Sequence, residues 1–293
     1  MFFVVGAQKA GTTMIHEWLK LEGCRLPRTK ETHFFSHPEM NKLGAKWYEE
    51  QFLGSGPQGE IDPEYLYSPT APSLIKQAYP DAKIIVLLRE PVERAYSQYN
   101  MTVMRGFETQ DFYYAMNHEE DRREDKNYTE HLSYIDRSIY VPQIKRFFNK
   151  FDRKQILFIK FNTLFEKNTS QDEYDKLCAF VGLKPKVKVT NHTQQANPAS
   201  RPRSKWVNQF LWEKNSFLFL KKLIKIILPI SKLRDQLSLK VYALNSKEIK
   251  RSEIDYLKVD HKIKSIILSD LRQLQGITNL DLSDWMMRYS DEK

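Results

Sequence analysis

The sequence contains little of what marks a secreted, metal-binding or membrane-spanning protein. Only two of its 293 residues are cysteines, Cys24 and Cys178, and neither has a neighbour at a metal-ligand spacing. So few cysteines in a chain of this length argue against a disulfide scaffold and favour a reducing compartment. No apolar run reaches the ~18 residues of a membrane-spanning helix, and a strand predicted from residue 2 leaves no room for a signal peptide. We therefore expect a cytoplasmic protein without a metal site.

Linkers rich in proline, glycine and serine are missing as well, as are low-complexity runs and internal repeats. The length allows one large α/β domain or two smaller ones, and a hydrophobic fraction of 41% is sufficient for a core. We predict a single domain over residues 1–293, with a core at residues 1–185 and a mostly helical extension at residues 186–293.

The most informative stretch that is present covers residues 2–13, FFVVGAQKAGTT. Four apolar residues lead into a loop with two glycines, a lysine and two threonines, a pattern typical of a buried strand followed by a phosphate-binding loop. The loop N–H groups and the next helix N-terminus would face an anion, and Lys9 would add a full charge. In the Walker pattern the lysine follows the second glycine, whereas Lys9 precedes Gly11 by two residues. This displacement argues against an ordinary ATPase or GTPase.

A second cluster follows the apolar run Lys83–Leu88, which predicts a central parallel strand. Arg89 stands at the carboxyl end of that strand, where open α/β sheets bind ligands. Pro91 suits the first turn of a helix, which would carry Ser97 about two turns further on. Arg89 and Ser97 would then hold a phosphate; alternatively, Arg89 pairs with a neighbouring carboxylate.

Periodicity and apolar runs predict further elements in the rest of the chain. They are a helix from Thr12, a helix at Tyr140–Phe148, a strand at Ile156–Ile159, a helix stop at Gly182, a loop at Lys188–Lys205, and a final helix from His261 to Leu274 that ends at Gly276.

The segment Lys30–Phe35, KETHFF, places charged residues directly before an aromatic pair. Its pattern alone favours an ordinary surface segment. In the alternative interpretation, Phe34 and Phe35 form the wall of a cleft and Glu31 acts as a general base beside them.

The net charge of +9 is concentrated late in the chain: residues 201–293 hold 19 Lys/Arg against 11 Asp/Glu. A basic surface favours polyanions, anionic lipids or a phosphorylated cofactor, although a solvated helix face would give the same composition. Residues 217–230 form either a core helix with a basic outer face or an interfacial helix in peripheral contact with a membrane.

Taken together, these motifs resemble the sulfotransferases that use 3′-phosphoadenosine 5′-phosphosulfate (PAPS), nearest to the heparan sulfate sulfotransferases and their bacterial relatives. The resemblance covers most of residues 1–185 and is patchier beyond. It rests on Gly6–Thr13 (the 5′-phosphosulfate loop), Lys30–Phe35 (the catalytic glutamate segment), Lys83–Tyr99 (the 3′-phosphate strand and helix), Arg137–Ile144, Gln155–Phe161 and Asp281–Trp285.

The resemblance implies a P-loop-like, three-layer α/β fold with a central parallel sheet, plus the helical C-terminal extension. It implies that Glu31 is the catalytic base and that Lys9 also stabilises charge on the leaving group, with His33 and then His16 as the next candidate bases. The donor would be PAPS, the product PAP, and no metal would be required. The residues implied to bind the donor are Lys9, Ala10, Gly11, Thr12 and Thr13 for the 5′-phosphosulfate, and Arg89 and Ser97 for the 3′-phosphate. A basic loop late in the chain would close over the 3′-phosphate, with Lys247, Lys250 and Arg251 as candidates; alternatively, these residues belong to a surface helix end.

The implied function is sulfuryl transfer to a hydroxyl or amine of a glycan, lipid or small molecule, with no specific nucleic-acid partner. One departure concerns Ile61, which stands where the heparan sulfate enzymes have a lysine, and it argues against a highly anionic acceptor. Glu60, Asp62 and Glu64 would then face a neutral or cationic acceptor, or be solvated. The alternatives are a P-loop kinase or NTPase, and a non-catalytic protein that binds anions or membranes. The oligomeric state cannot be read from the sequence.

Overall fold

The chain forms two compact units in a computed structural model. Unit 1 comprises Met1–Arg94, Asp136–Ala196 and His261–Lys293, and unit 2 comprises Ala95–Ile135 and Asn197–Asp260. The prediction of a single domain stays a prediction. The structure describes residues 1–166, 169–186, 188, 200–202, 204, 207, 222, 237, 240–241, 244–248 and 254–290.

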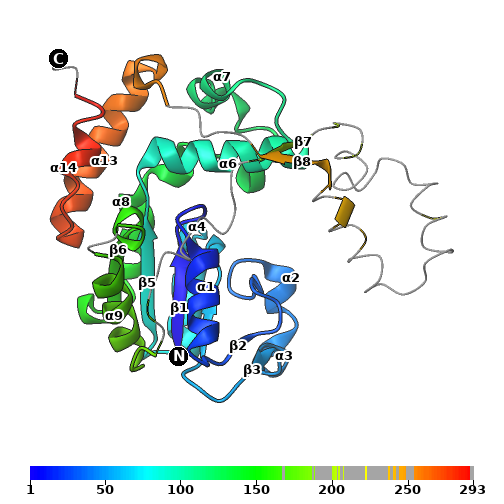
Figure 1. The fold of residues 1–293 in the computed structure, drawn as a ribbon, viewed down its shortest axis with the longest axis vertical. Coiled ribbons are helices and arrows are strands. Elements are labelled where there is room, and N and C mark those ends of the chain that lie inside the picture. Colours follow the sequence, from blue (N-terminus) through cyan, green and yellow to red (C-terminus); the bar gives the residue numbers. More distant parts are fainter. Residues whose placement is uncertain are drawn as a thin grey trace. The chain divides into compact units, whose positions relative to one another are not determined.

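The centre of unit 1 is a four-stranded sheet in the order β4-β1-β5-β6 (Figure 1). All three pairings between neighbouring strands are parallel, and helices flank the sheet. The two inner strands, β1 and β5, are apolar and almost wholly buried because the sheet is covered on both faces. This architecture confirms the predicted fold class. The strands are β1 (Phe2–Gly6), β4 (Gly59–Ile61), β5 (Lys83–Leu88) and β6 (Ile156–Lys160).

The remaining elements of unit 1 are helices and one small sheet. The helices are α1 (Thr12–Leu21), α2 (Pro38–Asn41), α3 (Gly44–Glu49), α4 (Glu64–Tyr67), α5 (Ala71–Ala78), α8 (Tyr140–Phe148), α9 (Ser170–Val181), α13 (His261–Thr278) and α14 (Ser283–Met286). Short 3₁₀ helices cover Asp136–Ser138, Arg153–Gln155 and Phe161–Leu164, and β2 (Leu26–Pro27) pairs antiparallel with β3 (Phe52–Leu53).

Unit 2 is built on helix α6 (Pro91–Arg105), which begins in unit 1. Its interior contains the buried carboxylate of Glu108, which accepts hydrogen bonds from Arg122 and the Tyr134 hydroxyl, both at 2.8 Å. Its other elements are α7 (Phe112–Asn117), β7 (Ser200–Pro202) paired with β8 (Ser246–Glu248), the short helices Glu120–Arg122 and Tyr256–Lys258, and a π-helix at Tyr128–Leu132.

Most of the predicted boundaries are confirmed. The helix from Thr12, the helix at Tyr140–Phe148 and the stop at Gly182 all form where expected, and the third strand extends one residue past Ile159. Gly182 adopts a left-handed φ of 88°, which a glycine C-cap requires.

The predicted stop at Gly276 is wrong. Helix α13 continues through Gly276 to Thr278, because a glycine inside a helix weakens it without ending it. The residue that leaves the right-handed conformation is Asn279, with φ 60°. Asparagine is the other residue that tolerates this geometry at a helix end.

Helix α13 is joined to the sheet layer through a buried carboxylate. Asp270 accepts hydrogen bonds from the backbone N–H groups of Tyr140 and Val141, at 2.9 and 3.0 Å, in the first turn of α8. Burial raises the pKa of Asp270 to about 6, although these donors oppose the shift. The C-terminal helix is therefore part of the packed core of unit 1.

Several sequence predictions lie outside the described residues. These are the roles of Lys250 and Arg251, the membrane contact through residues 217–230, and most of the loop at Lys188–Lys205. Among the helices that are described, none combines the length and apolar character needed to cross a membrane. Cys24 and Cys178 are both buried and unbonded to each other.

Candidate active site

The loop that follows β1 is here called the donor loop (Ala7–Thr13). Two glycines with positive φ shape it: Gly6, directly before it, and Gly11, within it. Gly6 has φ 151°, and a Cβ atom there would lie 2.6 Å from Cβ of Leu66. Gly11 has φ 91° and is the N-cap of α1, with no side chain to cap the helix. The first N–H groups of a helix have no intrahelical partner. The N-terminus of α1 therefore offers donors and a positive dipole end to an anion.

Two buried arginines hold the donor loop through its carbonyl oxygens. Arg89 donates from Nη1 to the Lys9 carbonyl at 3.0 Å, and Arg94 donates from Nη1 to the Gln8 carbonyl at 3.4 Å. Arg94 is completely buried, and its Nε also donates to Oγ of Ser138 at 2.7 Å. The carbonyl groups of the loop are thus turned toward two cations.

Arg89 has further contacts that fix its guanidinium. It lies 3.5 Å from Oε2 of Glu93 and its central carbon is 4.6 Å from the centre of the Phe161 ring. The sequence left open whether Arg89 pairs with a nearby carboxylate. It does pair with Glu93, and it also contacts the donor loop. Ser97 is the seventh residue of α6, half-buried and in unit 2. Its partnership with Arg89 stays a prediction.

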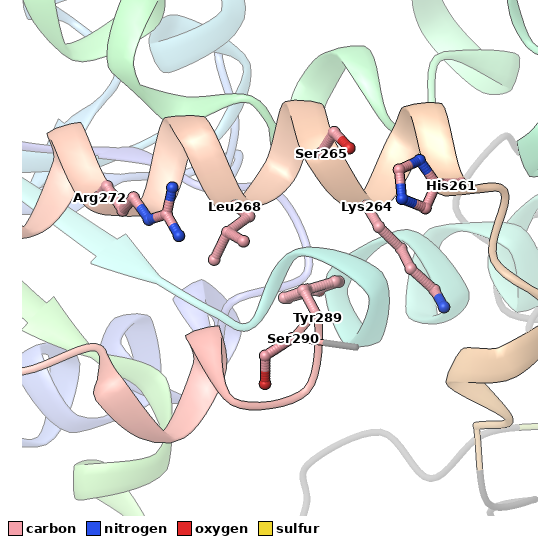
Figure 2. Close-up of a pocket in the computed structure, with 7 residues that line it drawn as sticks. All are labelled: His261, Lys264, Ser265, Leu268, Arg272, Tyr289 and Ser290. Atoms are coloured by element: carbon pink, nitrogen blue, oxygen red, sulfur yellow. The ribbon is translucent and has the colours of Figure 1, made fainter. Parts of the chain in front are cut away.

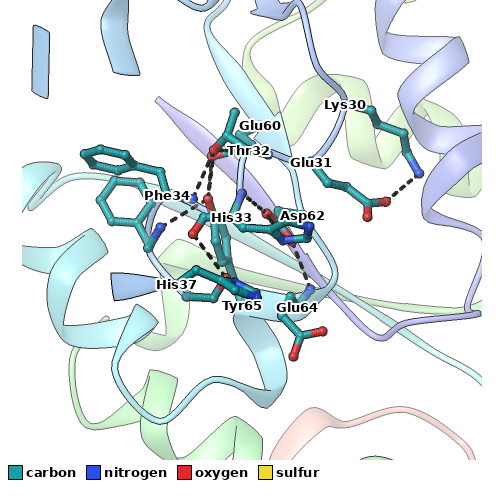
Figure 3. A network of polar contacts seen from close by, with 12 residues as sticks. Lys30, Glu31, Thr32, His33, Phe34, His37, Glu60, Asp62, Glu64 and Tyr65 are labelled. Atoms are coloured by element: carbon teal, nitrogen blue, oxygen red, sulfur yellow. Dashed lines mark hydrogen bonds and ion pairs between the residues drawn. The ribbon is translucent and has the colours of Figure 1, made fainter. Parts of the chain in front are cut away.

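Lys30 joins the donor loop to Glu31. Its Nζ donates to Oγ1 of Thr13 and to Oε1 of Glu31, both at 2.9 Å (Figure 3 shows the second contact). Glu31 is 34% exposed, so its carboxylate is open to an incoming group. Sequence reasoning named Glu31 and Thr13 separately and missed Lys30 as a residue of the site. The only available signal was its position next to Glu31.

The segment that carries Glu31, here called the glutamate segment (Lys30–Phe35), is anchored on a buried carboxylate of β4. Thr32 donates to Oε1 of Glu60 from its backbone N–H at 3.1 Å and from its hydroxyl at 2.5 Å. The hydroxyls of Tyr48 and Tyr65 donate to Oε2 at 2.6 and 2.9 Å (Figure 3). Burial, and next the charge of Asp62, raise the pKa of Glu60 from 4.5 to about 7.

The expectation that the carboxylates of Glu60, Asp62 and Glu64 are solvated or face the acceptor is wrong. Glu60 and Asp62 are completely buried. Glu64 forms a bidentate pair with Arg137 at 2.7 and 3.0 Å. All three serve internal contacts: Glu60 lies within the buried strand β4, and Asp62 and Glu64 follow it directly. Ile61, between them, is fully buried and belongs to the core.

His33 is held by Asp62 in two ways. Its backbone N–H donates to Oδ2 of Asp62 at 2.7 Å, and its ring Nδ1 lies 3.0 Å from the same oxygen. Burial lowers the pKa of His33, but the Asp62 carboxylate outweighs this effect and raises the pKa to about 9. The ring is therefore an imidazolium at neutral pH, which disfavours His33 as a general base. His16 is buried on α1, its Nδ1 is 3.1 Å from Oε1 of Glu17, and burial lowers its pKa.

Phe34 and Phe35 do not form the wall of a cleft, contrary to one expectation. They are 6% and 2% exposed. Phe34 stacks on Tyr48 at 4.5 Å between ring centres, and Phe35 meets Phe3 edge-on at 5.7 Å. The aromatic pair is the hydrophobic anchor of the glutamate segment, since large rings gain most from burial.

The structure thus brings the donor loop, Arg89, Lys30 and Glu31 into one region of unit 1. The side chain of Ala10 is completely buried and its backbone N–H donates to the Ala7 carbonyl at 3.1 Å, so a role of Ala10 in donor binding stays a prediction. Within the described part of the chain, no three His, Cys, Asp or Glu side chains gather in a way that could hold a metal ion. Whether the reaction needs a metal stays a prediction.

Comparisons with known proteins place this geometry in a family. The sequence model of the sulfotransferase domain matches residues 1–224. The chain is 27% identical over 195 residues to heparan sulfate glucosamine 3-O-sulfotransferase 5 of Mus musculus, covering 64% of this chain and 55% of that protein. It is 37% identical over 110 residues to the membrane-associated sulfotransferase kil1 of Dictyostelium discoideum, covering 35% of this chain and 23% of that protein. The chain spans about half the length of the first of these relatives.

A solved structure supports the same fold. The sulfotransferase from Alicyclobacillus acidocaldarius superposes with a TM-score of 0.65 over 97% of both chains, at 23% sequence identity. Because the domain match covers most of the chain, the comparisons and the site geometry agree on one conclusion: the chain belongs to the sulfotransferase family, near its heparan sulfate sulfotransferase-like group.

Proposed function

We propose that this chain transfers a sulfuryl group from PAPS to a hydroxyl or amine of a glycan, lipid or small molecule. The observation that carries the proposal is the Lys30 bridge, which holds the Glu31 carboxylate beside Thr13 at the N-terminus of α1. A base and an anion-binding helix end are thereby adjacent, as transfer from an anionic donor to a protonated acceptor requires.

The donor loop would bind the 5′ end of PAPS. Its fit rests on the uncapped N-terminus of α1 and on the two arginines that draw the Lys9 and Gln8 carbonyls away from the bound anion. The bound donor would supply an SO₃ group attached to a phosphate leaving group. Lys9 and the loop N–H groups would stabilise the charge that develops on the bridging oxygen as its bond to sulfur breaks.

Glu31 would take the proton of the acceptor O–H or N–H as the acceptor atom forms its bond to sulfur. Lys30 would orient the carboxylate by its hydrogen bond to Oε1. His33, charged and half-exposed, would add a positive group on the acceptor side. The chain's own contribution is therefore to align the two substrates, accept one proton and stabilise the departing phosphate.

The mouse relative is named for 3-O-sulfation of heparan sulfate glucosamine. Ile61 in place of a lysine still argues against a highly anionic acceptor, whereas Glu60, Asp62 and Glu64 no longer favour a cationic one, because these carboxylates are buried or paired. We keep a glycan among the proposed acceptors, together with lipids and small metabolites.

Calorimetric titration with PAP in the absence of magnesium tests donor binding. We expect saturable binding of PAP that Lys9→Ala weakens. Failure to bind PAP, together with good binding of ATP and magnesium, would overturn the proposal. Incubation of candidate acceptor extracts with the protein and PAPS, followed by mass spectrometry for an added SO₃ group, would then identify the acceptor.

A further inference from the structure

A cavity of about 360 Å³ lies against helix α13, and none of its lining residues belongs to the proposed transfer site. Figure 2 shows side chains from successive turns of α13 facing the turn that follows α14. His261, Lys264 and Arg272 share one face of the helix, because residues three, four, seven or eleven positions apart lie on one side. The wall opposite is formed by Tyr289 and Ser290.

The chemistry of the cavity is that of an anion site. Lys264 and Arg272 are cationic, and His261, Ser265 and Ser290 also line the cavity. Of the described residues that line the cavity, none is acidic. The nearby acid of α13, Asp270, belongs to the buried face and is engaged by the first turn of α8. His261 is also the first residue of α13, where the helix dipole favours negative charge.

A row of basic residues on a helix is often only solvated, but here the row faces a fixed wall on one side. Tyr289 is 3% exposed, and its hydroxyl donates to the carboxylate of Glu90. The neighbouring Arg288 donates from Nη1 to Oε1 of Glu93 at 2.7 Å. These contacts attach the turn to the start of α6, so the cavity exists before any ligand arrives. Preformed sites lose less entropy when they bind.

We propose that this cavity binds an oxyanion, a sulfate or phosphate group, carried on a compact molecule. A tetrahedral oxyanion has five heavy atoms, against the single one of a water that occupies about 30 Å³, so it would fill only part of the space. The remainder, beside Leu268 and the Tyr289 ring, suits a body of about the size of one sugar ring. The proposal does not depend on the transfer reaction, because none of these residues belongs to the donor loop or the glutamate segment.

The test is calorimetric titration at constant ionic strength with sodium sulfate, sodium phosphate and glucose 6-sulfate. Saturating PAP is added first, so that the donor loop is filled. We expect Arg272→Gln and Lys264→Gln each to raise the dissociation constant at least tenfold. The matched control is Lys262→Gln, which removes the same charge from an exposed position of α13 outside the cavity and should change it less than twofold.

Two results would overturn the proposal: Arg272→Gln and Lys264→Gln that bind like the unaltered protein, or Lys262→Gln that loses as much affinity as they do. Thermal unfolding of each variant checks that it is folded. Tighter binding of glucose 6-sulfate than of sulfate would show that the cavity prefers an anion attached to a sugar-sized molecule. Equal affinities would show that it binds the free anion. If PAP itself does not bind, the proposed transfer function fails. The difference in anion affinity between Arg272→Gln and Lys262→Gln still tests whether the cavity is an anion site.

Discussion

The donor loop and the glutamate segment lie in the same unit, but charges of opposite sign hold them. Arg89 and Arg94 hold the donor loop by its carbonyl oxygens, whereas Glu60 and Asp62 hold the glutamate segment by its N–H groups. Two carbonyls of the donor loop are engaged by cations and so do not repel an anion at the N-terminus of α1. A segment held by buried carboxylates keeps a positive partner, here His33, in its charged form.

The difference would allow one unit to present the proposed anion-binding surface and the proposed base side by side. The charge that fixes each backbone segment also sets the electrostatic character of the surface above it. The Lys30 bridge is the place where the two regions meet, because it contacts Thr13 on one side and Glu31 on the other.

The strongest test of the division of roles is Glu31→Gln. The amide keeps the size of the side chain and can still accept from Lys30, but it cannot take a proton. We expect sulfuryl transfer to fall by roughly 10²–10⁴-fold, with PAP affinity unchanged in calorimetry. Glu39→Gln, an exposed site on α2, is the control. Full transfer activity in Glu31→Gln would assign the base elsewhere.

Arg94→Met tests whether this arginine fixes the donor loop. It removes hydrogen bonds to the Gln8 carbonyl and to Ser138 from a completely buried side chain. We expect the free energy of unfolding in urea to fall by about 2–3 kcal/mol, and PAP binding to weaken because the loop loses a fixed point. Arg123→Met, at an exposed position, should change neither. A variant that binds PAP as tightly as the unaltered protein would contradict the role given to Arg94.

Glu60→Gln tests how the buried carboxylate of Glu60 anchors the glutamate segment, through the pH dependence of the free energy of unfolding. The folded-state pKa of about 7 lies above the ordinary 4.5, so the folded protein binds this proton more tightly than the unfolded chain. The contribution of Glu60 to stability is therefore fully present below about pH 4.5 and is lost as the pH rises through about 7, at about 1.4 kcal/mol per pH unit.

In Glu60→Gln we expect this part of the pH dependence to disappear, which urea unfolding at pH 5 and pH 8 would measure. Glu50→Gln, at an exposed position, should keep the pH dependence of the unaltered protein. If Glu60→Gln keeps it too, the carboxylate of Glu60 does not titrate in this range.

Thr13→Val gives the smallest expected effect and tests the bridge between the two regions. It removes the hydroxyl that accepts from Lys30 but keeps the branched shape. The donor is the charged Lys30 ammonium, and a hydrogen bond of this kind at a partly exposed position is worth about 1.5 kcal/mol, so we expect transfer to fall about tenfold. Thr13→Ser should restore most of it. Equal activity in Thr13→Val and Thr13→Ser would show that Lys30 does not need this contact.

The sequence predicted the parts of the fold that repeat over short distances. β1, β5 and α8 were expected from apolar runs and helical spacing, and each formed at those residues. β4 was not expected, because Gly59-Glu60-Ile61 is short and contains a carboxylate. Glu60 is tolerated in a strand only because Thr32, 28 positions away, and two tyrosines donate to it.

In the candidate site, too, some residues could be predicted from the sequence and others could not. Lys9 and Gly11 were predicted after one strand and Arg89 after another, at the carboxyl end where open α/β sheets bind ligands, and the family resemblance joined them in one donor site. The Lys30 contact spans 17 positions and depends on how the glutamate segment is anchored, which no local pattern contains. The error at Gly276 has the opposite cause, since a local rule was applied where helix packing decides the outcome.

The attachment of Tyr289 to Glu90 has a consequence for the synthesis of this protein. The two residues are 199 positions apart, and at ~5–20 residues per second the ribosome needs roughly 10–40 s to produce the second after the first. During that interval the carboxylate beside Arg89 has its backbone contacts at the start of α6 but lacks its last partner. Trp285, completely buried in the finished fold, arrives only with the same late segment. The nascent chain therefore completes the surroundings of Arg89 only after the segment that carries Trp285 and Tyr289 has been made, and a ribosome that stalls before that segment would display an unfinished surface to chaperones.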